Sequence, residues 1–125
     1  MPVAHRTFAN ARALFPAGRL DHENCESFRA ELSAQLDAAM RAGEPLVLDL
    51  SGLEYVSSAG LRCLMLAAKE ATARNGRVLV ASMQPVVAEI FQISRFHLLF
   101  EVFPTLREAL ASVSPQAAEA LDRST

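Results

Sequence analysis

The feature that most constrains the fold is the alternation of short apolar runs with longer amphipathic segments. Residues 23–42 carry apolar side chains at three- and four-residue spacing, which predicts a helix. A second helix is expected from Ser58 to about residue 75, where Asn and Gly close it. The apolar runs 45–50 and 77–81 predict buried strands. Helices that alternate with strands in this way indicate an α/β domain with a small, largely parallel sheet.

The segments around these elements are less regular. Residues 6–18 are expected to form one or two short strands, and residues 18–21 a turn that leads into the first helix. Residues 51–56 are interpreted as a loop between the second strand region and the second helix. Pro85 is placed near the start of a third helix, where its missing N–H costs nothing. A last short strand is expected within residues 98–103.

The C-terminal part begins with a helix-start signal. Thr105 and Glu108 have the spacing of a capping box, which predicts a final helix through Ala111. The tail 114–125 is expected either to extend this helix or to fray. We therefore predict one domain over residues 1–125, with its core at about 7–113.

Composition excludes several classes of function. The chain has 125 residues, a formal net charge of −2, and basic residues scattered along its length. This distribution argues against direct binding to nucleic acid. No apolar stretch is long enough to predict a signal peptide or a membrane span, so we expect a cytoplasmic protein without membrane insertion.

The two cysteines, Cys25 and Cys63, both fall in predicted helices. Neither has a neighbouring cysteine or a suitably spaced histidine in the sequence, so we expect reduced thiols and no metal site. The five glycines are dispersed as turn residues and form no phosphate-binding loop, so no cofactor is expected.

One segment carries a specific resemblance. Residues 46–66 read LVLDLSGLEYVSSAGLRCLML: an apolar strand that ends in Asp, a short loop, an aromatic residue, and a Ser-rich turn closed by Gly-Leu. This pattern resembles the signature of STAS domains, and with the element order around it the resemblance covers about residues 7–113. It implies the STAS fold, with about four helices packed mainly on one side of a small mixed sheet. The matching positions are Asp49, Tyr55, Ser57, Ser58, Ala59, Gly60 and Leu61.

The resemblance implies a regulator rather than an enzyme. STAS proteins of this type act as anti-sigma-factor antagonists: the unphosphorylated form binds an anti-sigma factor that is also a GHKL-type serine kinase, and so frees a sigma factor. A serine phosphatase resets the phosphorylated form. The regulated serine of the family lies two residues before the glycine, which places it at Ser58. Family members often have Asp before this serine and Ser or Thr after it, whereas this chain has Ser57 and Ala59. Ser57 is therefore a second, less favoured candidate for phosphorylation.

Physical chemistry allows two roles for these serines. A phosphate on Ser58 would sit at a helix N-terminus, where free N–H groups favour anions, so it would leave the helix intact and alter the outer surface. Alternatively, Ser57 or Ser58 caps the helix, and serine is among the best capping residues. Both hold if one serine caps and its neighbour is modified.

The expected partner-binding face follows from this placement, and Asp49 is expected to support the loop beside it by bonding to loop amides. The chain is expected to be a monomer or a weak dimer. An alternative is a STAS subunit that is never phosphorylated, in a lipid-transport ABC system or a stress-sensing scaffold. The residues of the expected face are Glu54, Tyr55, Ser57, Ser58, Ala59, Gly60 and Arg62.

No catalytic site is expected. The residues around Ser58 do not form the G-x-S-x-G elbow of a serine hydrolase. His5, His22 and His97 lie far from Ser58 in the sequence, and none has the setting of a general base. Asp49 is the best candidate acid, but a role in holding the loop is favoured.

Overall fold

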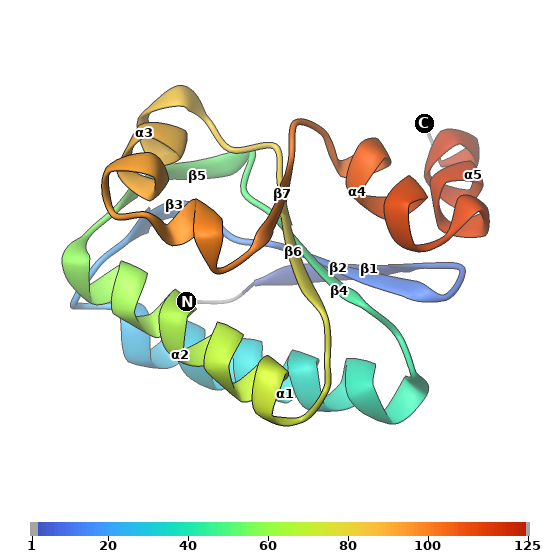
Figure 1. The fold of residues 1–125 in the computed structure, drawn as a ribbon, viewed down its shortest axis with the longest axis horizontal. Helices are drawn as coiled ribbons and strands as arrows, with labels where there is room; N and C mark the ends of the chain where they lie inside the picture. The colour runs from blue at the N-terminus through green and yellow to red at the C-terminus, as the bar shows by residue number, and fades with distance from the viewer. Residues whose placement is uncertain (1–2, 125) are drawn as a thin grey trace.

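A computed structural model describes residues 3–124 and contains a five-stranded sheet (Figure 1). Its strand order is β1-β2-β4-β6-β7, in which β1 and β2 are antiparallel and the remaining pairs are parallel. The predicted α/β class with a mixed, largely parallel sheet is therefore confirmed. The strands are β1 (Ala4–Phe8), β2 (Ala11–Phe15), β4 (Leu46–Asp49), β6 (Val78–Ala81) and β7 (Glu101–Phe103).

Helices cover both faces of this sheet. In Figure 1, α1 and α2 lie side by side on one face, whereas α4 and α5 lie on the other face at one end. The described residues thus form five α-helices, four of which cover the two faces while α3 packs against β5, where about four helices mainly on one side were expected. A 3-10 turn, η1 (Phe96–Leu98), follows the third helix. The α-helices are α1 (Cys25–Ala42), α2 (Ser58–Ala73), α3 (Pro85–Ile93), α4 (Leu106–Val113) and α5 (Pro115–Arg123).

The central strands explain why two layers of helices are needed. Every residue of β4 is buried. Leu46 and Leu48 belong to the apolar cluster beneath α1 and α2, whereas Val47 between them belongs to the cluster beneath α4 and α5. Successive side chains of a strand point to opposite faces, so a strand with buried apolar residues on both faces requires cover on both sides.

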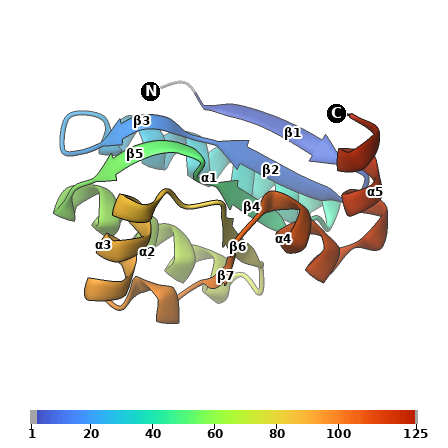
Figure 2. The ribbon, with the colours of Figure 1, turned by 90° about the horizontal axis from the view of Figure 1, so that it is seen from above.

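A second, two-stranded sheet corrects two predictions. Residues 18–21 and 51–56 were expected to form a turn and a loop. Instead, β3 (Ala17–Leu20) pairs in parallel with β5 (Gly52–Val56). Figure 2 shows these strands running together beside the main sheet, next to α3. Two short strands brought together from distant parts of the chain leave little local signal, which is why sequence patterns missed them.

The C-terminal tail was expected either to extend the preceding helix or to fray, and it forms a separate helix, α5, over Pro115–Arg123. Ser114 has an extended backbone and separates α4 from α5. It caps α5 by accepting a hydrogen bond from the amide of Ala117. Its hydroxyl also bonds the side chain of Asn10 in the β1–β2 turn. Thr125, the last residue of the tail, lies outside the described residues. Within residues 3–124 no helix has the length and hydropathy needed to cross a membrane.

Candidate functional site

The junction of β5 and α2 holds the two candidate serines, and the structure gives them different positions. Ser57 has an extended backbone and is the N-cap of α2; its hydroxyl accepts a hydrogen bond from the amide of Gly60 at 3.2 Å. Its own amide donates to the carbonyl oxygen of Leu20 at 2.9 Å. Ser57 therefore fixes both the start of the helix and its attachment to β3.

Ser58 is the first residue of α2 and is exposed to solvent. Its hydroxyl makes no hydrogen bond within residues 3–124. The amides at the first two positions of a helix have no partner inside it, and the first turn of α2 contains no acidic residue. A negative group carried by Ser58 would therefore meet free N–H donors and the positive end of the helix dipole.

Gly60 explains why small residues occupy this turn. A Cβ atom built at position 60 would lie 2.7 Å from the carbonyl oxygen of Leu20 and 2.9 Å from its Cγ. Such distances are too short for any side chain, so β3 packs directly on the backbone of α2. Ala59 is half-buried and contacts the main core. The turn therefore combines a tightly fixed backbone with one outward serine.

Asp49 lies at the end of β4 and is 5% exposed. Its Oδ1 accepts hydrogen bonds from the amide of Ser51 at 2.9 Å and from the Ser51 hydroxyl at 2.6 Å. The carbonyl of Ser51 in turn accepts from the side-chain amide of Gln84 at 2.7 Å. Asp49 thus holds the turn that leads into β5, and it makes no hydrogen bond to Ser57 or Ser58.

The remaining residues of the predicted face lie on β5 and on the first turns of α2. Glu54 and Arg62 are exposed, and neither forms an ion pair within the described part of the chain. Tyr55 is half-buried, and the guanidinium of Arg19 lies 4.4 Å from the centre of its ring. Sequence analysis missed Arg19 because it assigned this residue to a turn. Its place beside Tyr55 results from the pairing of β3 with β5.

The histidines lie on other elements. His5 is in β1, His22 precedes α1 and His97 is in η1. None of them bonds to Ser57 or Ser58 within residues 3–124. The junction presents the exposed hydroxyl of Ser58 at the protein surface.

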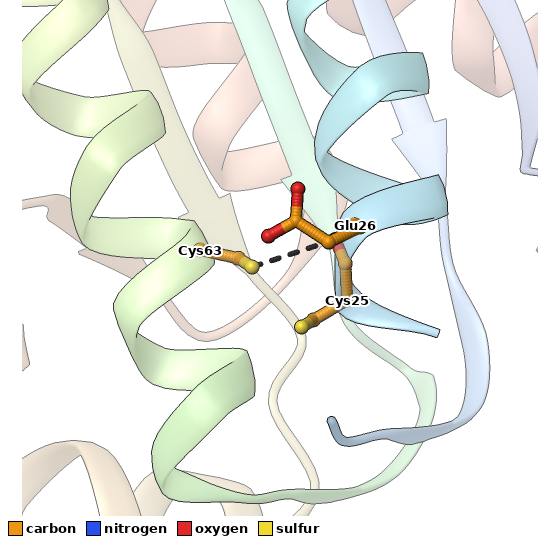
Figure 3. A group of neighbouring side chains, drawn as sticks. All are labelled: Cys25, Glu26 and Cys63. Atoms are coloured by element: carbon orange, nitrogen blue, oxygen red, sulfur yellow. Dashed lines mark hydrogen bonds between the residues drawn. The ribbon is translucent and has the colours of Figure 1, made fainter. Parts of the chain in front are cut away.

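The two cysteines are close in space, although sequence spacing gave no sign of this. Cys25 begins α1 and Cys63 lies in α2, and both side chains are buried. The thiol of Cys63 donates to the carbonyl oxygen of Cys25 at 3.4 Å (Figure 3). Burial and the hydrogen bond with Cys25 raise the pKa of Cys63 to about 11, so this thiol is protonated at neutral pH.

Comparison with known proteins identifies the class to which this fold and junction belong. The profile of the STAS domain matches residues 4–109, which is most of the chain. The chain therefore belongs to the STAS domain family. The match includes the β5–α2 junction, and it ends within α4.

Individual relatives point to one branch of this family. The predicted anti-sigma factor antagonist BtrV of Bordetella bronchiseptica is 41% identical over 76% of this chain and 78% of its own length. Solved structures show that the fold is shared: the crystal structure of a predicted anti-sigma factor antagonist from Thermotoga maritima superposes with a TM-score of 0.79 at 18% identity, over 89% of this chain and 93% of that one. The structure of SpoIIAA of Bacillus in its phosphorylated form superposes with a TM-score of 0.66 at 20% identity, over 90% of this chain and 100% of that one.

Proposed function

We propose that this chain is an anti-sigma-factor antagonist whose binding to an anti-sigma factor is switched by phosphorylation of Ser58. The antagonist role is supported by the 41% identity to BtrV, a protein named for that activity. The switch is supported by one observation in particular: Ser58 is exposed with a free hydroxyl at the start of α2, while Ser57 already serves as the helix cap.

Ser57 caps α2 whereas Ser58 is exposed, and this difference favours Ser58 as the modified residue. A phosphate on Ser57 would remove the cap of α2 and crowd the carbonyl oxygen of Leu20, to which the Ser57 amide is bonded. A phosphate on Ser58 meets neither obstacle. It adds about −1.5 to −2 charges at neutral pH, and the free amides of the first turn stabilise it without any change of fold.

The phosphate would act on the partner rather than on this protein. The proposed binding face combines the Glu54–Tyr55 edge of β5 with Ser57, Ser58, Ala59, Gly60 and Arg62. An anti-sigma factor that covers this face must exclude water from Ser58. A phosphate cannot be desolvated there without cost, and an acidic group placed opposite it costs several kcal/mol. Phosphorylation would thus dissociate the complex and leave the antagonist folded.

The partners follow from the same scheme. The anti-sigma factor is proposed to be a GHKL-type serine kinase that phosphorylates the residue it binds, and a serine phosphatase would restore the binding form. The protein is proposed to act in the cytoplasm, as a monomer or a weak dimer. Asp49 is proposed to keep β5 and its exposed edge in position through Ser51.

The decisive experiment compares three forms of the protein in pull-downs from the native cell, with bound proteins identified by mass spectrometry. We expect a GHKL-type kinase to be retained by the wild type and by Ser58→Ala, and lost with Ser58→Asp. The matched control is Ser112→Asp, which adds the same charge to an exposed serine of α4, and which should retain the kinase.

A second measurement assigns the phosphorylated residue. The captured kinase and ATP should add one phosphate, by intact mass, to the wild type and to Ser57→Ala but none to Ser58→Ala. If Ser58→Ala is phosphorylated and Ser57→Ala is not, Ser57 is the regulated residue. If wild type, Ser58→Ala and Ser58→Asp all retain the same transport or scaffold proteins, the chain is a fixed STAS subunit and the switch is refuted.

A further inference from the structure

A cluster of metal-binding side chains lies between the start of α1 and the first half of α2. We propose that Cys25, Glu26 and Cys63 form a site for one thiophilic divalent cation, of the Zn²⁺ type. The two sulfur atoms and a carboxylate oxygen of Glu26 all lie within 4.8 Å of one another. Figure 3 shows the three side chains converging from the two helices.

The distances are close to those that a bound ion would impose. A tetrahedral Zn²⁺ holds sulfur at about 2.3 Å and oxygen at about 2.0 Å, which places neighbouring ligand atoms roughly 3.5 Å apart. Since the three atoms already lie within 4.8 Å of one another, small rotations of the side chains close the site.

The type of donor selects the type of metal. Two thiolates are soft ligands, which favour Zn²⁺ and similar ions over Mg²⁺ or Ca²⁺. Cys25 and Cys63 are buried at 7% and 3% exposure, whereas Glu26 is exposed. The carboxylate therefore lies at the entrance and the sulfurs form the floor. Three protein ligands leave a fourth position for water or for a group from another molecule.

Binding exchanges protons for the metal. Each thiol loses its proton to solvent and forms a sulfur–metal bond, so one divalent ion releases two protons from the two cysteines, and Glu26 contributes a carboxylate oxygen. Without metal, the thiol of Cys63 is occupied in its hydrogen bond to the carbonyl oxygen of Cys25.

The location gives the site a structural consequence. Cys25 is the first residue of α1, and Cys63 lies in α2 a little more than one turn beyond Ser58. A metal that bridges them would fasten the N-terminal half of α2 to α1. The melting temperature should then rise with the concentration of Zn²⁺, as for any ligand that binds only the folded state.

The test uses the reduced full chain with Co²⁺ as a spectroscopic probe. We expect one Co²⁺ per chain, an absorption band from thiolate-to-cobalt charge transfer, and loss of this band when Zn²⁺ is added. Cys25→Ser and Cys63→Ser should abolish the band. Glu26→Gln should weaken binding by roughly tenfold or more, because even outer-shell partners of metal ligands contribute about that much. Glu23→Gln, at a neighbouring exposed acid, is the matched control and should bind as the wild type does.

X-ray absorption of the Zn²⁺-loaded wild type keeps the test independent of how the variants fold. It should show two sulfur neighbours at about 2.3 Å. A shell of nitrogen and oxygen alone, a charge-transfer band that survives Cys63→Ser, or the absence of stoichiometric binding would each refute the site. Formation of a Cys25–Cys63 disulfide in place of metal binding, under the same reducing conditions, would refute it as well.

Discussion

Ser57 and Ser58 are neighbours of the same chemical type, but only one of them contributes to the stability of the helix. Ser57 provides the hydroxyl that bonds the amide of Gly60, whereas the Ser58 hydroxyl points to solvent. We expect Ser57→Ala to lower the free energy of unfolding by about 1 kcal/mol, the usual contribution of a serine cap. Ser58→Ala should change it by less than about 0.5 kcal/mol. Urea denaturation of the two variants beside the wild type measures both values. Equal losses, or a larger loss for Ser58→Ala, would contradict the assignment of the cap.

Sequence analysis located this pair but could not separate its members. A serine before a helix is a sufficient signal for a cap or a modified residue, and the resemblance to STAS domains favoured Ser58. Which hydroxyl caps depends on the backbone angle at which β5 ends, and that angle follows from the pairing of β5 with β3. The proximity of Cys25 and Cys63 was hidden in the same way, since 38 residues separate them in the chain.

A side-chain pair adds to the backbone pairing that holds the three-residue edge strand β7 beside β6. Glu101, its first residue, accepts two hydrogen bonds from Arg77, at 2.6 Å and 2.7 Å. This pairing holds the pKa of Glu101 below its ordinary value. Both side chains are about half exposed, so solvent screens the pair and its contribution to stability is at most about 1 kcal/mol.

The pH dependence of this contribution has a definite sign. Because the pKa of Glu101 is lower in the folded state, the stabilisation is complete above the unfolded value of about 4.3 and is lost as the pH falls through the lowered folded value. Glu101→Gln should therefore be less stable than the wild type at pH 7, by up to about 1 kcal/mol. The difference should shrink in acid and at high salt. Glu119→Gln, which removes an exposed acid from α5, is the control. Urea titrations across pH test this, and a difference independent of pH would contradict it.

Among the elements, the ones predicted correctly were those with a local signal. The spacing of Phe28, Leu32 and Leu36 defines one face of α1, and Gly43 closes the helix with a φ of 70°. In β3 and β5, by contrast, no more than two residues of each strand are fully buried. A strand of this kind is fixed by its partner, which in this fold comes from more than thirty residues away in the chain.

At the scale of the whole molecule, the sheet is shared between two apolar clusters. One lies beneath α1 and α2, and the other beneath α4 and α5. Strands β2, β4 and β6 contribute alternate residues to both, so neither cluster can be lost without exposing one face of the same strands. The placement of α5 on the second face could not be read from its sequence, because its short apolar stripe fits either side equally well. The cover on this face is required by β4 and β6, whose buried apolar residues point to both sides of the sheet.

This shared sheet predicts that α5 unfolds together with the rest of the molecule, although the STAS profile ends at residue 109. Ala118 is 3% exposed and belongs to the second cluster. Ala118→Asp would bury an unpaired carboxylate and should lower the free energy of unfolding by more than about 2 kcal/mol. Gln116→Asp places the same charge at an exposed position in the first turn of α5 and should change the free energy of unfolding by less than about 0.5 kcal/mol.

If the two clusters form one cooperative unit, Ala118→Asp shifts the single urea transition of the whole chain, and far-UV circular dichroism and a probe attached to α2 report the same shift. If α5 were an independent appendage, the transition reported from α2 would stay at the wild-type midpoint, and the two clusters would have to be treated as separate units.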